Sequence, residues 1–447
     1  MFPQRFRVGA PVALVFWLWL GLASGEPDRG ASKGLSLSQA IDLAFAHNPD
    51  LTAATARIGE AEARVAEATA AFYPRLTARA EYTYTDNPAV GFSNIVAQRR
   101  FSPGFDINHP GWVANFRPEI VGSWNLYRGG QDAYLKRAAE LGVEAAELER
   151  STLRNRLAAV VTAAYYAVLS APRQVDVAHR SVETVTREIE QAKARVAEGI
   201  TLKAEVMSLE ARAMEAYESE LKARNAIELS LSALRTLLGG ESFRIAEQEP
   251  ESAAAAPGDF QKLLDQALTE RPEIYAAAHQ VEIRRQELAA AQGARLPRVN
   301  AYAGYGQNSR SLDFSLGRDN AILGLNAEMD LFSGGAVSAR IEAAEHRLVE
   351  ALAVEQRIRL EIEDELRRAH STLSETLQRV KAAQAGAASA EEALRLVNEQ
   401  YRGGTATVTR YLEAETDRAD AALRAIVARY ESRVAAAQLQ KAVGYWR

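Results

Sequence analysis

The stretch of sequence that decides the fold runs from Gln131 to Glu198 and reads QDAYLKRAAELGVEAAELERSTLRNRLAAVVTAAYYAVLSAPRQVDVAHRSVETVTREIEQAKARVAE. It opens directly after the glycine pair 129–130 and closes at Gly199, and no glycine run interrupts it. Alanine, leucine, glutamate and arginine dominate the stretch, and all four are good helix formers. We therefore predict one helix over 131–198, about 100 Å long at ~1.5 Å per residue.

The same pattern occurs a second time over 336–402, after Gly334-Gly335 and before Gly403-Gly404. The two copies align without a gap at an offset of 205 residues, the separation of Gly199 and Gly404. Apolar residues recur at matched positions, mostly in steps of three, four or seven: Val143, Ala146, Leu153, Leu157, Val161, Val168 and Val175, and Leu348, Ala351, Ile358, Ile362, Leu366, Leu373 and Val380. This spacing predicts a coiled-coil seam used twice, in a chain built from two similar halves.

Residues 1–25 have the form of a secretory signal peptide. Arg5 and Arg7 precede an apolar run over 12–22, and the small residues 23–25 offer a cleavage site. Because a run of this length is too short to span a bilayer as a helix, we predict export rather than a membrane anchor.

The composition excludes several classes of function. The net charge is −5, with no basic stripe, so nucleic acid is not expected as a partner. Cysteine is absent, which rules out a disulfide, a thiolate metal site and a cysteine nucleophile. The six histidines are scattered, and no phosphate-binding loop or nucleophile motif occurs. We therefore predict that the protein is not an enzyme and has no catalytic residue, cofactor or metal site.

Prolines and glycines mark the boundaries of the two halves. Pro74 and Pro297 each end a helical pattern and begin an extended segment. The predicted layout is a signal peptide over 1–25; a first repeat over 26–238, with a β-hairpin at about 75–127, a long helix over 131–198 and a return helix over 201–238; a linker over 239–258; and a second repeat over 259–447, with a β-hairpin at about 298–332, a long helix over 336–402 and a return helix over 405–443.

The hairpins show the alternation of strands with one apolar face. In 75–85, for example, Leu76, Ala78, Ala80, Tyr82 and Tyr84 alternate with polar residues. The apolar face would be a core in a soluble sandwich, but would face lipid in an outer-membrane barrel. Four strands per chain are too few for a membrane barrel, and open strand edges in lipid are costly, so such a barrel must be shared between chains.

The sequence resembles the TolC family of outer-membrane efflux and secretion channels over nearly the whole mature chain. The resemblance rests on the duplicated order of the segments Leu37-Ser38-Gln39-Ala40-Ile41, Asn48-Pro49-Asp50-Leu51, Tyr73-Pro74-Arg75-Leu76, Leu296-Pro297-Arg298-Val299, Trp124-Asn125-Leu126-Tyr127-Arg128-Gly129-Gly130, Leu331-Phe332-Ser333-Gly334-Gly335 and Tyr401-Arg402-Gly403-Gly404-Thr405.

The resemblance implies a mainly α fold with a β-barrel contribution. Three chains would form a homotrimer with one 12-stranded outer-membrane barrel and a periplasmic α-helical tunnel. It further implies a Gram-negative outer membrane as the location, with the tunnel extending into the periplasm. The duct would be passive, with outer-membrane lipid around its barrel, and would be energised by an inner-membrane pump through a periplasmic adaptor (membrane fusion) protein.

The resemblance places functional residues at the helical tip. Acidic rings are common there in the family, and Glu205 and Glu413 stand in acidic positions, whereas Arg410 replaces an acid. These three residues are our candidates for a tip gate. Gly199, Ile200, Gly404 and Thr405 are candidate adaptor contacts. An exported soluble coiled-coil scaffold or adaptor is the alternative, and it leaves the two hairpins unexplained.

Overall fold

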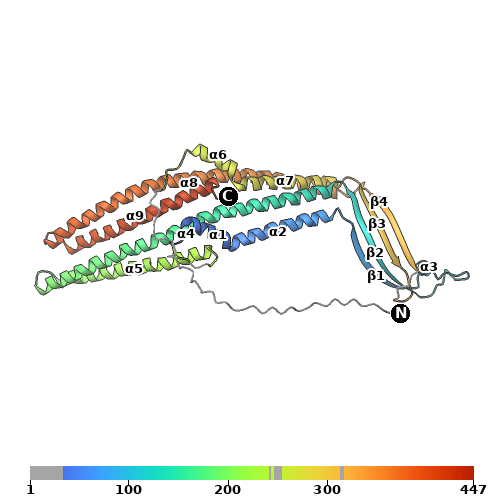
Figure 1. Ribbon diagram of the computed structural model, residues 1–447, viewed down its shortest axis with the longest axis horizontal. Coiled ribbons are helices and arrows are strands. Elements are labelled where there is room, and N and C mark those ends of the chain that lie inside the picture. The colour runs from blue at the N-terminus through green and yellow to red at the C-terminus, as the bar shows by residue number, and fades with distance from the viewer. Residues whose placement is uncertain (1–33, 241–242, 246–253, 313–316, 447) are drawn as a thin grey trace, which may run out of the picture.

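The structure is a computed structural model that describes residues 34–240, 243–245, 254–312 and 317–446. The predicted signal peptide and part of the predicted linker lie outside these residues. The elements are α1 (Leu37–His47), α2 (Pro49–Ala70), β1 (Arg75–Thr85), α3 (Pro88–Ala97), β2 (Val113–Arg128), α4 (Gln131–Ala197), α5 (Lys203–Leu237), α6 (Phe260–Glu270), α7 (Pro272–Gly293), β3 (Arg298–Gln307), β4 (Asp319–Glu328), α8 (Ala336–Arg402) and α9 (Val408–Val443). Figure 1 shows a long rod with the strands at one end and two helical turns at the other.

The duplicated long helices of the predicted fold class are confirmed. Helices α4 and α8 each span 67 residues, which is about 100 Å. Each begins behind a left-handed glycine, Gly130 with φ 77° and Gly335 with φ 87°, a conformation that costs glycine little. Helix α9 begins at Val408 rather than at 405, because the Thr407 side chain caps it by accepting a hydrogen bond from the Arg410 backbone N–H.

The four strands form one antiparallel sheet in the order β1-β2-β3-β4. The register sets Ala78 opposite Ile120, and Ile120 opposite Tyr305, so the apolar residues of successive strands share one face. That face is open to the surroundings, with Leu323 84% exposed. On the opposite face, the carboxylate of Glu119 pairs with two arginines from neighbouring positions. The sheet therefore has the apolar and polar sides that the alternation predicts.

The sheet departs from the simple alternation in two places. The alternation puts Tyr127 on the polar face, but a β-bulge between Asn125 and Tyr127 sets Tyr127 opposite Val299, a residue of the apolar face. Strand β4 ends at Glu328, short of the predicted end of the hairpin at 332. Glu328 pairs with the first residue of β3, so beyond it the strand has no partner for its backbone groups.

Backbone contact between the two halves fixes the junction of the strands with the helices. Gly129 has a φ of 64°, and a Cβ atom there would overlap the carbonyl oxygen of Gly293 at the end of α7. The indole Nε1 of Trp124 donates a hydrogen bond of 2.9 Å to the carbonyl oxygen of Phe72. Because both residues are glycines, the two backbones can touch here. This contact fixes the direction in which the rod leaves the sheet.

The helices form a layer that continues the order of the strands. Near the sheet, α2 packs on α4, α4 on α7 and α7 on α8. Toward the other end, α5 packs on α4, α4 on α9 and α9 on α8. Helices α2, α5 and α8 therefore lie at the two edges of the layer, with α4 and its neighbours between them.

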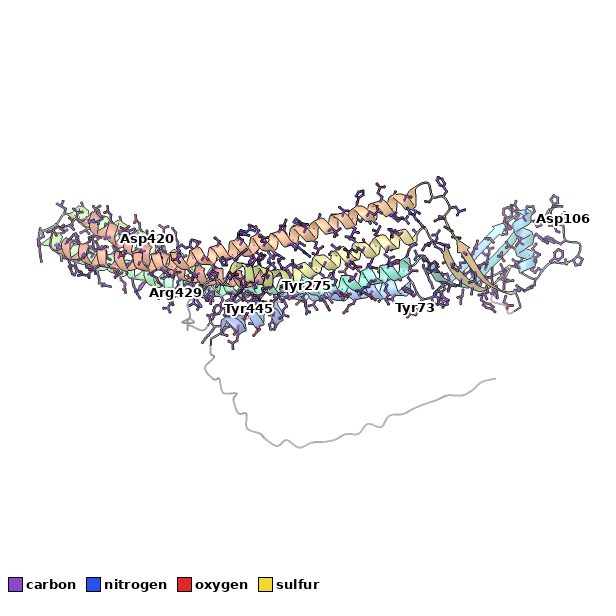
Figure 2. The ribbon with its side chains drawn as sticks, turned by 90° about the horizontal axis from the view of Figure 1, so that it is seen from above. Tyr73, Asp106, Tyr275, Asp420, Arg429 and Tyr445 are labelled. Carbon is purple, nitrogen blue, oxygen red and sulfur yellow. The ribbon has the colours of Figure 1, made fainter. Side chains whose placement is uncertain are left out.

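Apolar side chains hold this layer together at several heights. A cluster halfway along joins α1, α4 and α5, with Val161, Leu234 and Leu238 fully buried. A second cluster, around Leu366, joins α6 and α7 to α8 and α9. Within the described residues, none of the helices has a stretch that is both long and apolar enough to cross a bilayer. In Figure 2, Asp106 marks the far end beyond the strands and Asp420 lies toward the opposite end.

Candidate functional site

The tip of the rod consists of two similar turns, one between α4 and α5 and one between α8 and α9. Gly199 and Gly404 take left-handed conformations, with φ of 74° and 75°. The backbone N–H of Ile200 donates to the carbonyl of Arg195, and that of Thr405 to the carbonyl of Gln400, both at 2.9 Å. Each long helix therefore closes with the same kind of left-handed glycine cap.

Behind the turns, an apolar cluster packs the two helical hairpins against each other. Val185, Ile189 and Ala192 of α4 and Leu209 of α5 meet residues of α8 and α9 there. At its centre the rings of Tyr401, on α8, and Tyr411, on α9, stack with centroids 5.3 Å apart and planes 19° apart. Tyr411 is 2% exposed, and burial raises the pKa of its phenol, with the nearby Glu188 and Glu415 adding to the effect.

One hydrogen bond links the two hairpins beside the turns. The hydroxyl of Tyr401 donates to Oε2 of Glu205, on α5, at 3.4 Å. Burial, followed by the charge of Glu205, raises the pKa of Tyr401, so the phenol keeps the proton it donates. The guanidinium of Arg195 lies over the same ring, 5.3 Å from its centroid. Tyr401 of α8 thus contacts the α4/α5 hairpin through both its hydroxyl and its ring.

A buried carboxylate, paired within its own helix, provides a second link between the hairpins, further from the turns. Glu415 of α9 is 0% exposed. It accepts hydrogen bonds from Arg418 (Nη2 at 2.8 Å and Nε at 3.1 Å) and from the hydroxyl of Ser181, on α4, at 2.8 Å. Burial alone would lower the pKa of Arg418, but the hydrogen bond and charge of Glu415 outweigh it and raise that pKa. The Arg418 guanidinium therefore remains charged.

The structure places the predicted gate residues on the two hairpins. Arg410 and Glu413 form a pair within α9, with Nη1 and Oε2 3.4 Å apart. Because both side chains are more than half exposed, this pair contributes only ~0–1 kcal/mol to the free energy of unfolding. Glu205 lies on α5 against Tyr401 instead. The four candidate adaptor contacts, Gly199, Ile200, Gly404 and Thr405, are all exposed at the end of the rod.

Sequence reasoning missed the groups that link the hairpins. The sequence alone marks Tyr401 only as part of a family motif and indicates no role for Glu415 and Arg418. A signal was present, because Val408, Tyr411, Glu415 and Arg418 follow steps of three, four and three, the spacing of a coiled-coil seam. A charge at a seam position is costly unless it is paired, so the seam itself marks this pair as buried.

Comparison with known proteins gives consistent matches. The family model described as outer membrane efflux protein matches residues 40–240 and 263–445. The chain is 26% identical to protein CyaE of Bordetella pertussis over 431 residues, covering 92% of this chain and 84% of CyaE. It is 30% identical to outer membrane protein OprJ of Pseudomonas aeruginosa over 199 residues, covering 42% of this chain and 40% of OprJ, so this match spans less than half of that relative.

The fold also matches a solved structure. The crystal structure of a membrane protein from Pseudomonas aeruginosa superimposes with a TM-score of 0.79 at 23% identity, over 92% of this chain and 91% of that one. At this level of identity the likeness concerns the fold: the layer of long helices and the four-stranded sheet.

Proposed function

Because the chain belongs to the outer membrane efflux protein family, whose members are outer-membrane channels rather than enzymes, we propose that it is the exit duct of a tripartite efflux or type I secretion system. The strands lie in the outer membrane and the helical rod extends into the periplasm. A periplasmic adaptor docks on the tip, and an inner-membrane pump supplies the energy. The observation that carries this proposal is an exposed apolar face on a sheet too small to close by itself.

We infer a homotrimer from the unpaired edges of the sheet. Among the residues that the structure describes, strands β1 and β4 each pair on one side only, and unpaired backbone groups in lipid cost several kcal/mol each. Pairing β4 of one copy with β1 of the next removes both edges. Three copies then give a 12-stranded barrel, which lies within the range of sizes of outer-membrane barrels.

The native mass of the protein tests this assembly. We expect the protein to be found in the outer-membrane fraction and to have the mass of a trimer when it is extracted in mild detergent, measured by light scattering or native mass spectrometry. A monomer or dimer in the soluble periplasmic fraction would instead support an exported coiled-coil scaffold.

We further propose that the tip is the gate. Relaxing the α8/α9 hairpins away from the α4/α5 hairpins would widen the end of the tunnel, and the Tyr401–Glu205 hydrogen bond opposes that motion. The exposed Arg410–Glu413 pair opposes the same motion more weakly. The exposed turns with Gly199, Ile200, Gly404 and Thr405 are where an adaptor would make contact and favour the open arrangement.

Replacing Tyr401 by phenylalanine tests the gate. The variant keeps the stacked ring but loses the bond to Glu205, and a hydrogen bond to a charged group is worth about 1.5 kcal/mol or more, or roughly tenfold in a two-state equilibrium. We expect about tenfold more time in the high-conductance state in planar bilayers. Arg410→Ala is the comparison, with a smaller increase expected. Wild-type conductance and leakiness in both variants would rule out these residues as gate elements.

A further inference from the structure

Helix α3 packs on the polar face of the sheet, at the end of the strands away from the helical rod (Figure 1). The pairing of β2 with β1 is regular from Val113 to Ser123, so the side chains of β2 alternate between the two faces there. Val113 and Asn115 therefore share the face of Glu119, whose carboxylate pairs with two arginines. Both are buried, and a Cβ atom at Gly91 of α3 would lie 3.2 Å from the Val113 side chain.

The opposite face at this level stays apolar and aromatic. Trp112, directly before β2, stacks on Tyr84 of the apolar face, with the ring centroids 4.9 Å apart. Both rings are more than half exposed. Aromatic side chains at the end of an apolar face are typical of the level at which a barrel leaves the bilayer. Helix α3 therefore lies at the height of this aromatic pair, but on the other side of the sheet.

Gln98, directly after α3, joins this helix to both connections between the strands. Its side chain is almost fully buried, with 1% exposed. Its amide Nε2 donates hydrogen bonds to the carbonyl oxygen of Ala114 at 2.8 Å and to Oδ1 of Asn115 at 3.0 Å. It also bonds to the carbonyl oxygen of Ser309, in the β3–β4 connection, at 3.4 Å. Asn115 donates in turn to Oδ1 of Asn308 at 2.9 Å, so the amide groups form one connected network.

The backbone after Gln98 is held in an unfavourable conformation. Arg99 has a φ of 57°, and among the residues that the structure describes it is the only non-glycine residue with a positive φ. A Cβ atom is crowded in this conformation, and helices usually end there with glycine. In this position Nη2 of Arg99 donates to the carbonyl oxygen of Asp319, the first residue of β4, at 3.4 Å. The end of α3 is thus tied across the sheet a second time.

The closed barrel gives this arrangement a function. The polar face of a membrane barrel faces the lumen. A barrel of about eight strands is filled by its own side chains, so a larger barrel leaves an open channel. We propose that α3 of each copy lies over this channel at the outer mouth and limits the size of molecules that pass, and that Gln98 positions it there. This inference rests on the proposed function, because the polar face becomes a lumen only in a closed barrel.

Labelling of an introduced cysteine from outside the cell tests the proposal. The chain has no cysteine of its own. Thr77 is exposed on the polar face of β1, ~26 Å along the strand from Thr85 at ~3.3 Å per residue. A maleimide added to intact cells therefore has to pass α3 to reach Thr77→Cys. We expect a small charged maleimide to label this cysteine, and a maleimide on a long polyethylene glycol chain to label it only slowly.

Replacing Gln98 in the Thr77→Cys background is expected to open the mouth. Gln98→Leu keeps the size of the side chain but removes the donor to three oxygens. The polymer-linked maleimide should then label Thr77→Cys at least about tenfold faster, because buried hydrogen bonds that held α3 in place are lost. Ser93→Ala, at an exposed position of α3, is the matched control and should label at the parent rate. Replacing residues 88–111 by a short Gly-Ser turn removes α3 and should give the fastest labelling.

Asp106→Cys separates this proposal from the proposed function. Asp106 is exposed at the far end of the molecule (Figure 2), and both maleimides should label it in intact cells. No labelling of Asp106→Cys would overturn the proposed function. If it is labelled, equally fast labelling of Thr77→Cys by both maleimides in the parent would overturn the role of α3. So would polymer labelling that stays slow after α3 is replaced. Labelling accelerated by that replacement but not by Gln98→Leu would overturn the role of Gln98.

Discussion

Replacing Glu415 by alanine is expected to loosen the tip more than any other single change to its side chains. The variant leaves the guanidinium of Arg418 buried without the carboxylate that accepts its two hydrogen bonds, and it removes the acceptor of the Ser181 hydroxyl. Breaking a buried pair by removing one partner costs about 3–5 kcal/mol. Hydrogen–deuterium exchange of the α9 amides near the tip should therefore be at least about a hundredfold faster.

A double variant separates the loss of the pair from the loss of packing. Glu415→Leu with Arg418→Met removes both charges and keeps apolar volume, and such replacements are often neutral or stabilising. We expect its exchange to return close to that of the wild type. If the single Glu415→Ala variant exchanges at the wild-type rate, Glu415 does not stabilise the tip.

Gly129→Ala is expected to disrupt the junction between the strands and the helices. Its left-handed φ of 64° alone costs a non-glycine residue about 1–2 kcal/mol. The added methyl group would also overlap the carbonyl of Gly293, which cannot move without shifting the end of α7. Together these effects should lower the free energy of unfolding by at least about 3 kcal/mol. The loss should be seen as a lower thermal midpoint and a lower yield of detergent-extracted trimer.

Gly142→Ala is the matched control for this change. Gly142 lies inside α4, and a Cβ atom there would have no neighbour within 4 Å. Alanine in a helix interior is favoured over glycine by up to about 1 kcal/mol, so the thermal midpoint should stay the same or rise. Equal losses in the two variants would mean that the Gly129–Gly293 contact has no special importance.

The sequence was enough to predict the long helices and the strands, because both depend on local and periodic signals. Each long helix is rich in good helix formers, although α4 contains Pro172, and has a glycine at each end. The repetition of this pattern at a constant offset identifies the duplication. The strand faces follow from an alternation of period two. These signals can be read from the sequence without knowledge of any tertiary contact. The fold class could therefore be predicted.

The contacts between the hairpins could not be predicted in the same way. The bond from Tyr401 to Glu205 joins residues 196 positions apart, and its partners depend on how α8 rotates against α5. The bulge that moves Tyr127 to the apolar face leaves no mark in the alternation. The Arg410–Glu413 pair was predictable because it lies within one helix at i, i+3, whereas its role at the tip stays a prediction.

The inserted helix α3 has a consequence for the symmetry of the assembly. It lies in the β1–β2 connection, over 86–112, whereas the β3–β4 connection, over 308–318, is shorter. Because each chain contains two similar halves, a trimer repeats the wall of its tunnel in pseudo-sixfold fashion. At the outer mouth that symmetry falls to threefold, since the two connections of each chain differ in length. In such a trimer the outer mouth would therefore repeat every 120°, whereas the helical wall would repeat nearly every 60°.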